Sequence, residues 1–258
     1  MRSILHKVWI VGAGPGDPEL ISVKGLKTIQ KADVILYDAL VSQELLDFAP
    51  TNCKKIYVGK RKGHKEFAQE EINQLIVFYS IRYKCVVRLK GGDPNVFGRG
   101  HEEMEYVKRR GISVETISGI SSVLAAPAAA GIPLTKRGIN ESFWVITGTL
   151  SSGEMSNDIS LAAQSKATVV ILMGMTHLEK IAGIFKAARC QSEPMALIQQ
   201  ATTPHQKVVI ATAGDIVERA LESGISSPAV IIIGKVVNES DLAGLLDTVK
   251  VERLQKID

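Results

Sequence analysis

Cysteine is scarce in this chain, and the three cysteines present, Cys53, Cys85 and Cys190, lie far apart with no C-x-x-C pair. An odd number of widely spaced cysteines argues against a disulfide framework and against a thiolate metal site. The histidines show no metal-site spacing, so His64 and His101 are interpreted as peripheral or structural. The sequence therefore predicts no bound metal and fits a reducing compartment.

Long apolar runs are also missing. None approaches the roughly 20 residues that a membrane helix needs, since the longest candidate, VLAAPAAAGIPL, is broken by Pro127 and Pro133. Near the N-terminus, His6 and Lys7 interrupt the apolar segment ILHKVWIVGAG. This segment is therefore interpreted as a first strand rather than a secretory signal, and the protein is expected in the cytoplasm.

The chain has no strong excess of either charge: it contains 31 Lys and Arg residues and 27 Asp and Glu residues, which gives a net charge of +4. Such a mild excess gives no argument for a nucleic-acid partner, although an anionic small substrate remains open. The 258 residues, 45% of them hydrophobic, are enough for one large or two ordinary globular domains.

The stretch from Arg88 to Met104, RLKGGDPNVFGRGHEEM, reads as a strand, a loop and a helix. Gly91 and Gly92 allow positive φ or a close approach to a ligand, while Asp93 supplies a carboxylate. Ligands of open α/β sheets sit at the carboxyl ends of strands, so this loop is a candidate binding loop. A tight structural turn is the alternative reading.

Similar loops follow four more predicted strands. With the strand CVVRL at 85–89, the first half contains five strands separated mostly by helices, a pattern typical of a parallel α/β sheet. The other four are expected at 8–11, 32–38, 54–58 and 113–117, and end on GAGPGD, YDAL, GKRKGH and SGISS. Five such loops at one edge favour a binding site over five independent turns.

The first loop, GAGPGDPEL, partly resembles the dinucleotide fingerprint G-x-G-x-x-G. Gly12 and Gly14 fit, but Asp17 takes the place of the third glycine and Pro18 keeps it non-helical. The following helix is delayed to about Ser22, a plausible N-cap. A non-catalytic module that binds NAD therefore stays an alternative, which these features disfavour.

The second half repeats the α/β pattern, and the boundary is predicted near Gly138, giving domains 1–138 and 139–258 with a short C-terminal tail. Only ATTPH and its neighbours separate two of the strands, which is too short for a parallel crossover, so that pair is expected to be antiparallel and the second sheet mixed. The predicted strands are 144–148, 168–174, 194–200, 207–213 and 229–237.

These motifs together resemble a known family. The runs GAGPGDPELISVKGLKTIQKADVILYD, GKRKGH, QEEIN, RLKGGDPNVFGRGHEE and SGISSVLAAPAAAGIPLTKRG are similar to the tetrapyrrole methylase superfamily, and in particular to its uroporphyrinogen-III C-methyltransferases. The resemblance covers residues 8 to about 237. It implies two α/β domains with S-adenosylmethionine (SAM) in the cleft between them, a homodimer, and S-adenosylhomocysteine as a product.

The implied reaction is methylation of uroporphyrinogen III at C2 and C7 to give precorrin-2, on the way to sirohaem and cobalamin, by a single-function enzyme. Later precorrin methylases and the branch that methylates ribose in ribosomal RNA are alternatives within the superfamily; the weak net charge speaks against the RNA branch. The resemblance places the following residues on SAM: Pro15, Gly91, Gly92, Asp93, Val96, Ser121, Ser122, Met173 and Ala201. Ala201 stands where a glycine is common.

The same resemblance makes Asp38 the proton acceptor and Lys60 the proton donor. A sulfonium methyl is already a good electrophile, so the enzyme must mainly align a pyrrole carbon with it and then remove a proton from the ring. Without the family, Asp38 reads as a turn residue and Lys60 as a solvated lysine. The eight substrate carboxylates call for cations, and the candidates, each also readable as a solubilising surface charge, are Arg61, Arg99, Lys136 and Arg137.

Overall fold

The chain was analysed as a computed structural model, which describes residues 7–59 and 67–240. Its internal contacts divide it into two compact units, Met1–Ser122 and Val123–Asp258. The contacts thus place the division earlier in the chain than the boundary near Gly138 that the sequence suggests.

The first unit contains a sheet of five parallel strands in the order β3-β2-β4-β1-β5. The predicted parallel sheet is confirmed, and because all strands run the same way, their carboxyl ends share one edge. The strands are β1 (Lys7–Gly12), β2 (Val34–Tyr37), β3 (Lys54–Tyr57), β4 (Cys85–Lys90) and β5 (Ser113–Ile117).

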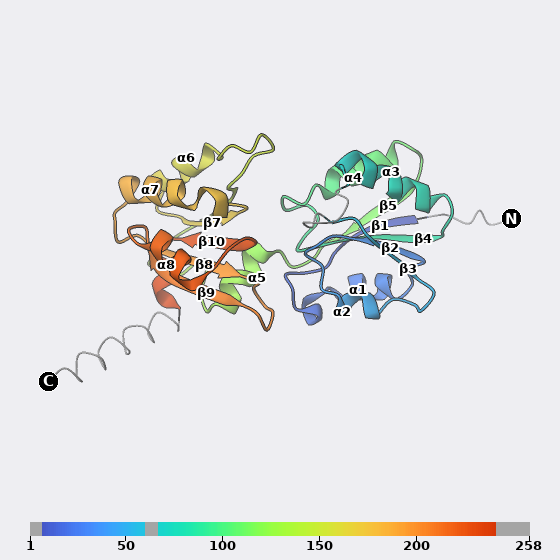
Figure 1. The fold of residues 1–258 in the computed structure, drawn as a ribbon, viewed down its shortest axis with the longest axis horizontal. Helices are drawn as coiled ribbons and strands as arrows, with labels where there is room; N and C mark the ends of the chain where they lie inside the picture. The colour runs from blue at the N-terminus through green and yellow to red at the C-terminus, as the bar shows by residue number, and fades with distance from the viewer. Residues whose placement is uncertain (1–6, 60–66, 241–258) are drawn as a thin grey trace. The chain divides into compact units, whose positions relative to one another are not determined.

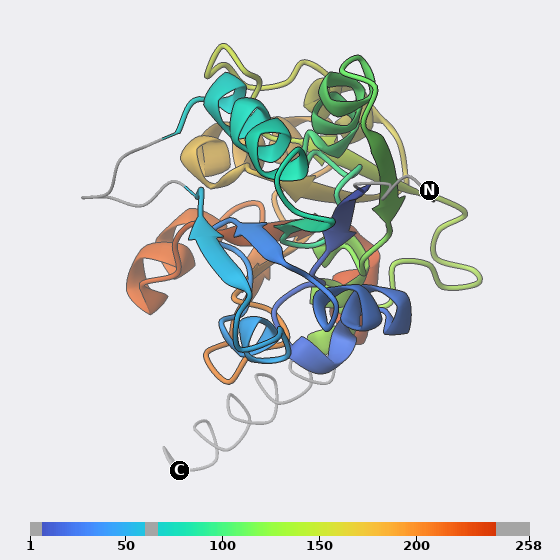
Figure 2. The same cartoon turned by 90° about the vertical axis from the view of Figure 1, so that its right-hand side faces the viewer.

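Helices cover both faces of this sheet (Figures 1 and 2). Successive side chains of β1 point to opposite faces: Ile10 packs with Ile76 of α3 and Val107 of α4, whereas Val11 packs with Ile29 of α1. Both faces are apolar, as expected for a buried parallel sheet. The helices are α1 (Val23–Ile29), α2 (Glu44–Asp47), α3 (Gln69–Ser80) and α4 (Gly100–Lys108), and a 3-10 turn, η1 (Pro18–Leu20), precedes α1.

The late start of α1 follows from two side chains. Asp17 accepts a hydrogen bond from the amide of Glu19 at 2.8 Å, which begins η1. Ser22 is the N-cap of α1, and its hydroxyl accepts a bond from the amide of Gly25 at 3.2 Å. The predicted N-cap at Ser22 is therefore confirmed, and the helix does not begin inside the glycine motif.

The second unit contains a mixed sheet in the order β6-β7-β10-β8-β9, in which only β6 and β7 pair in parallel. The mixed sheet and the antiparallel pairing of β8 with β9 confirm the sequence-based expectation. The strands are β6 (Phe143–Thr147), β7 (Thr168–Leu172), β8 (Pro194–Gln199), β9 (Lys207–Thr212) and β10 (Ala229–Ile233).

The prediction that the last strand reaches residue 237 is wrong. Gly234 adopts a φ of 140°, which ends β10, and residues Lys235–Glu239 form the 3-10 helix η3. The core of this unit is built around Phe185, Ile181 and the inward side chains of the sheet. Its helices are α6 (Asp158–Gln164), α7 (Leu178–Ala188), preceded by the 3-10 turn η2 (Met175–His177), and α8 (Ile216–Ser223).

Helix α5 (Ser122–Ala129) was not predicted, because it contains Pro127, which the sequence reading treats as a break. Its end is bonded to the second unit. The carbonyl of Ala129 accepts a bond from the side chain of Gln206 at 3.1 Å, and the carbonyl of Ala130 accepts one from the hydroxyl of Ser240 at 2.7 Å. These bonds explain why the contacts divide the chain before α5 rather than after it.

Candidate active site

The loops after β1 and β4 are joined backbone to backbone. The amide of Gly92 donates to the carbonyl of Gly14 at 2.7 Å, and the amide of Gly14 donates back to Gly92 at 3.3 Å. Both residues have positive φ, 84° at Gly14 and 64° at Gly92, which favours glycine at these positions. The two glycine-bearing motifs that the sequence singled out are therefore one structural unit.

The loop after β5 packs against the same pair. A Cβ at Gly119 would lie 2.3 Å from the carbonyl oxygen of Gly92 and 2.8 Å from the Cα of Gly12. No side chain fits there, so three strand ends meet through their backbones alone. By contrast, a Cβ at Gly92 would meet its nearest atoms, Cα of Ser121 and N of Ser122, only at 3.9 Å. These are ordinary van der Waals distances, so the neighbouring backbone does not crowd Gly92.

Asp93 ties two of these loops together. One carboxylate oxygen accepts a bond from the amide of Gly119 at 3.1 Å, and the other accepts one from the amide of Asn95 at 2.8 Å. The amide of Val96 bonds to the carbonyl of Asp93 at 3.3 Å. The predicted cofactor residues of the first unit all lie at one sheet edge, in loops or, for Ser122, at the start of α5: Pro15, Gly91, Gly92, Asp93, Val96, Ser121 and Ser122.

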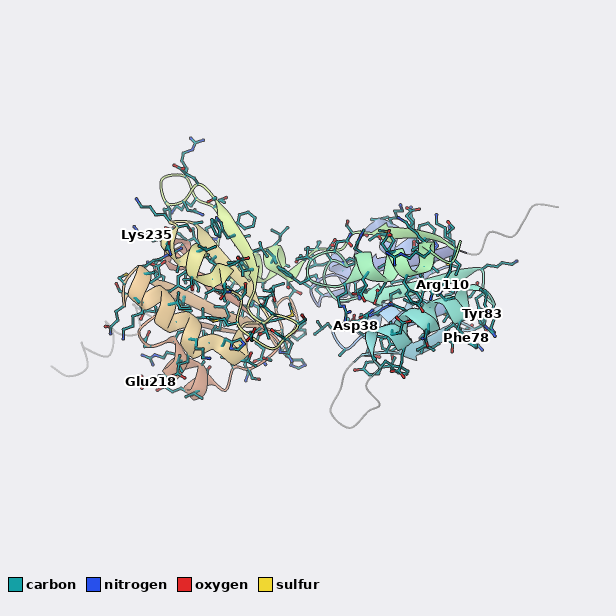
Figure 3. The ribbon with its side chains drawn as sticks, turned by 90° about the horizontal axis from the view of Figure 1, so that it is seen from above. Asp38, Phe78, Tyr83, Arg110, Glu218 and Lys235 are labelled. Carbon is teal, nitrogen blue, oxygen red and sulfur yellow. The ribbon has the colours of Figure 1, made fainter. Side chains whose placement is uncertain are left out.

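Asp38 lies at the same edge, directly after β2. One carboxylate oxygen accepts bonds from the amides of Leu40 at 3.2 Å and Gly91 at 3.4 Å, and the other lies 3.5 Å from a guanidinium nitrogen of Arg88. The side chain keeps 24% of its surface exposed. In Figure 3, Asp38 is at the opposite end of the first unit from Phe78 and Tyr83. A fixed, ionisable and accessible carboxylate therefore stands beside the glycine loop.

In the second unit the predicted residues Met173 and Ala201 follow β7 and β8. These strands are both antiparallel to β10, so their carboxyl ends share one edge. Met173 has a φ of 56°, and Gln200 and Thr202, which flank Ala201, have φ values of 49° and 66°. Positive φ in residues other than glycine is strained and is common at functional sites. The methionine side chain is 51% exposed, whereas Ala201 is buried.

Thr149, which the sequence reading missed, supports Met173. Its hydroxyl donates to the carbonyl of Met173 at 2.6 Å and thereby helps to hold the strained residue. Gly148 and Gly174 also touch here, since a Cβ at Gly148 would lie 2.3 Å from the Cα of Gly174. The sequence signal that could have indicated this contact is the pair of glycines, one after each of two neighbouring strands.

Two of the three predicted substrate cations that the structure describes, Arg99 and Lys136, are paired with carboxylates. Arg99 caps α4 with a φ of 59° and binds both carboxylate oxygens of Glu102, at 2.8 and 2.9 Å. Lys136 is paired with Glu239, and Arg137 is exposed. The predicted residues Lys60 and Arg61 lie outside the described residues.

A model of the tetrapyrrole (corrin/porphyrin) methylases matches residues 7–217 of this chain. The chain belongs to the tetrapyrrole methylases. It is 48% identical to the uroporphyrinogen-III C-methyltransferase of Methanocaldococcus jannaschii, a match that covers 91% of this chain and 98% of that relative. It is also 42% identical to a sirohaem synthase of Psychrobacter, covering 91% of this methylase but 48% of the synthase.

The fold of this methylase matches a solved structure of the same class. The uroporphyrin-III C-methyltransferase of Thermus thermophilus in complex with S-adenosylhomocysteine aligns with a TM-score of 0.78 and 39% identity, covering 90% of this chain and 99% of that one. The family resemblance and the expected fold of the tetrapyrrole methylases are therefore confirmed.

The described part of the methylase offers neither a metal site nor a membrane span. Across residues 7–59 and 67–240, no three His, Cys, Asp or Glu side chains are grouped so that they would hold a metal ion. In the same ranges no helix has the length and apolar character to cross a membrane.

A buried charged cluster lies beneath Asp38, and the sequence reading missed it. Arg88 and Lys90 project from β4, and Glu103 from α4, and all three are almost fully buried. One oxygen of Glu103 accepts bonds from Arg88 Nε at 3.2 Å, from Lys90 Nζ at 3.1 Å and from the side chain of Gln69 at 3.1 Å. The available signal was two cations at alternate positions of an apolar strand, which places both on one face.

The charged groups in this cluster shift one another's pKa values. Burial opposes ionisation of Glu103, but the cations of Arg88 and Lys90 and the bond from Gln69 bring its pKa below the ordinary value of 4.5. Burial, together with the charge of Arg88, lowers the pKa of Lys90 against the attraction of Glu103 and Asp38. The cluster therefore favours an ionised Glu103.

This shift predicts an acid-sensitive fold. A carboxyl group whose pKa is lower in the folded state stabilises the fold above its unfolded pKa, and that contribution is lost as the pH falls through the folded pKa. We therefore expect the midpoint of thermal unfolding to fall as the pH is lowered below about 4.5, the ordinary value for this group. Differential scanning calorimetry from pH 6 to pH 3 measures it. The Glu103→Gln variant should show a flatter dependence, and an unchanged slope would contradict the assignment.

Proposed function

We propose that this methylase transfers methyl groups from SAM to C2 and C7 of uroporphyrinogen III, giving precorrin-2 for sirohaem and cobalamin synthesis. The observation that carries the proposal is the end-to-end likeness to the Methanocaldococcus jannaschii uroporphyrinogen-III C-methyltransferase. The strand-end loops of the first unit supply the parts that such a reaction needs. These are a glycine turn at the strand end, a carboxylate that fixes it, and an accessible second carboxylate.

The residues at the glycine turn fit a bound SAM. A Cβ at Gly92 would make only ordinary van der Waals contacts, whereas a Cβ at Gly12 or Gly119 would clash with backbone atoms. Asp93 holds the turn in shape through Gly119. In the second unit, Met173 and Ala201 are the proposed SAM contacts. When bound, SAM supplies an electrophilic methyl group, so the work left to the protein is alignment of the substrate carbon and removal of a proton.

Asp38 is the proposed proton acceptor. Its amide partners Leu40 and Gly91 bind one oxygen and Arg88 faces the other, so the carboxylate has a fixed orientation while a quarter of its surface remains open. A positioned carboxylate can take the ring proton that is lost after methylation. Lys60 is proposed as the proton donor on the family resemblance alone.

Binding of the substrate carboxylates is assigned to Arg61, Arg99, Lys136 and Arg137. Arg99 presents two of its guanidinium nitrogens, Nε and one terminal nitrogen, in a fork that suits a carboxylate, as its contact with Glu102 demonstrates. An exposed pair of this kind is worth only about 0–1 kcal/mol. Exchange of Glu102 for a substrate carboxylate at Arg99 therefore costs little free energy. Exchange of Glu239 for a substrate carboxylate at Lys136 is expected to cost similarly little.

The family resemblance also supports three proposals about the oligomeric state, the compartment and the domain organisation. The protein is expected to be a homodimer, to act in the cytoplasm, and to fold as two α/β domains. Analytical ultracentrifugation of the full chain measures the first of these directly, and a monomer at micromolar concentration would contradict it.

The decisive test is an anaerobic assay with freshly generated uroporphyrinogen III and SAM, with mass spectrometry of the product. We expect a gain of two methyl groups that requires both protein and SAM, and NMR then assigns C2 and C7. A protein that binds SAM but leaves uroporphyrinogen III unchanged would move the substrate to another tetrapyrrole.

A variant of Asp93 tests the cofactor site independently of the substrate. Replacing Asp93 by Ala leaves the amide of Gly119 without its acceptor and releases the glycine turn. An unpaired amide of this kind costs about 1–3 kcal/mol, so SAM binding should weaken by about tenfold or more in isothermal titration calorimetry. Asp47→Ala, at an 82% exposed carboxylate of the same unit, is the matched control. Equal SAM affinity in both variants would remove Asp93 from the site.

A further inference from the structure

The buried cluster of Arg88, Lys90 and Glu103 is not needed to stabilise the fold. Removing three charges from water is costly, and a layer of well-packed apolar residues usually stabilises a core at least as well. The neighbouring positions of β4, Val87 and Leu89, are apolar and fully buried. A cluster of charges on this strand therefore points to a role in the chemistry at the strand end.

Arg88 is held on all sides. Its Nε donates to Glu103 at 3.2 Å, and one terminal nitrogen donates to the carbonyls of Leu89 at 3.0 Å and Leu36 at 3.4 Å. The other terminal nitrogen lies 3.5 Å from the carboxylate of Asp38. The guanidinium is thus a rigid bridge, with Glu103 at one end and Asp38 at the other.

We propose that Glu103 is a positioning residue for methyl transfer: it anchors Arg88, and Arg88 holds the carboxylate of Asp38 in its orientation. The inference rests on the proposed function, in which Asp38 accepts the ring proton. Glu103 itself is fully buried and acts only through Arg88.

Other charges near the cluster do not replace this arrangement. Among the described residues, the charged groups facing Glu103 are Arg88 and Lys90 of β4, while α3 contributes the neutral Gln69. Glu70 of α3 accepts the hydroxyl of Tyr106 instead. On β5, which also packs against α4, Glu115 is paired with Lys7 and Lys24.

The first test is the Glu103→Gln variant, which keeps the size of the side chain but removes its charge. Because Arg88 then loses its anionic anchor, kcat should fall by about tenfold or more, whereas KM for SAM should change by less than about twofold. The matched control is Glu115→Gln, which removes a carboxylate that also bridges two cations, here Lys7 and Lys24, but lies on the edge strand β5. Its kcat should stay unchanged.

A double-mutant cycle with Asp38→Asn separates positioning from structural damage. If Glu103 acts through Asp38, adding Glu103→Gln to the Asp38→Asn enzyme should lower the residual rate by less than about twofold. A further tenfold loss in that background would overturn the proposal, as would normal kcat in Glu103→Gln itself.

The double variant Glu103→Gln with Lys90→Met tests whether a loss of activity in Glu103→Gln comes only from leaving the buried charge of Lys90 without its anion. It removes one buried anion and one buried cation, so the net charge of the cluster does not change. If Glu103 only neutralises Lys90, kcat should recover in this variant, which would contradict the anchoring role. If Glu103 anchors Arg88, kcat should remain at least about tenfold low while SAM still binds.

Failure of the proposed function gives a different result. In that case the unaltered protein transfers no methyl group to uroporphyrinogen III, and the inference falls with the function. When the unaltered protein is active and Asp38→Asn is impaired, the Glu103 variants alone decide the inference.

Discussion

Replacing Asp38 by Asn should lower kcat for methyl transfer by about 10²- to 10⁴-fold, the range expected when a positioned general base is lost. The amide has nearly the same shape, so the contacts with the amides of Leu40 and Gly91 can persist through the side-chain oxygen. What disappears is the negative charge that faces Arg88 and accepts the proton. Binding of SAM should stay within about threefold of the unaltered protein, because the substitution keeps the loop contacts.

Single-turnover kinetics with both substrates bound measures this effect without interference from product release. Asp47→Asn, at an exposed carboxylate of α2, serves as the control and should leave kcat unchanged. Normal turnover in Asp38→Asn would show that another group removes the proton, and would leave Asp38 as a structural residue of the strand end.

Replacing Gly119 by Ala should have the second large effect, this time on binding and stability together. The new methyl group would lie 2.3 Å from the carbonyl oxygen of Gly92 and 2.8 Å from the Cα of Gly12. Since both neighbours are backbone, one of the loops must move. Overpacking of this kind costs about 1–3 kcal/mol of stability, and a shift of about 1 Å at the glycine turn can weaken function about 100-fold.

Thermal unfolding and calorimetric SAM titration measure the two parts of this prediction. Gly183→Ala is the control, because a Cβ there meets nothing within 4 Å and the residue lies inside α7. That variant should gain about 0.5–1 kcal/mol of stability, as expected for glycine replaced in a helix. Unchanged SAM affinity in Gly119→Ala would mean that the three joined strand ends do not form the cofactor site.

Much of the first unit could be predicted from its sequence. The strands are short runs, each followed by a loop that carries glycine or aspartate, and this pattern placed β5 at the residues where the structure has it. The same pattern located Asp38 and the turn at Gly91, because parallel strands bring their carboxyl ends to one edge. These features depend on local sequence.

Features that depend on distant partners could not be predicted. Glu103 belongs to a helix whose sequence reads as amphipathic and solvated, and only the packing of α4 on β4 buries it beside Arg88. The strain at Met173 likewise depends on a bond from Thr149, which comes from another strand end. Helix α5 was missed for a local reason, since Pro127 masks it.

The strand order has a consequence for how the protein folds. Strands β1 and β2 are consecutive in the chain but do not pair, because β4 lies between them. The bond pair between Gly14 and Gly92 therefore closes only after a long loop of chain has been ordered. A chain that is still being synthesised and does not yet contain β4 lacks this bond pair, so the cofactor should bind only after the sheet is complete. Any ligand held there then stabilises the folded state by RT ln(1 + [L]/Kd), where [L] is the free ligand concentration, so a larger supply of methyl donor should lower the unfolded fraction of the protein.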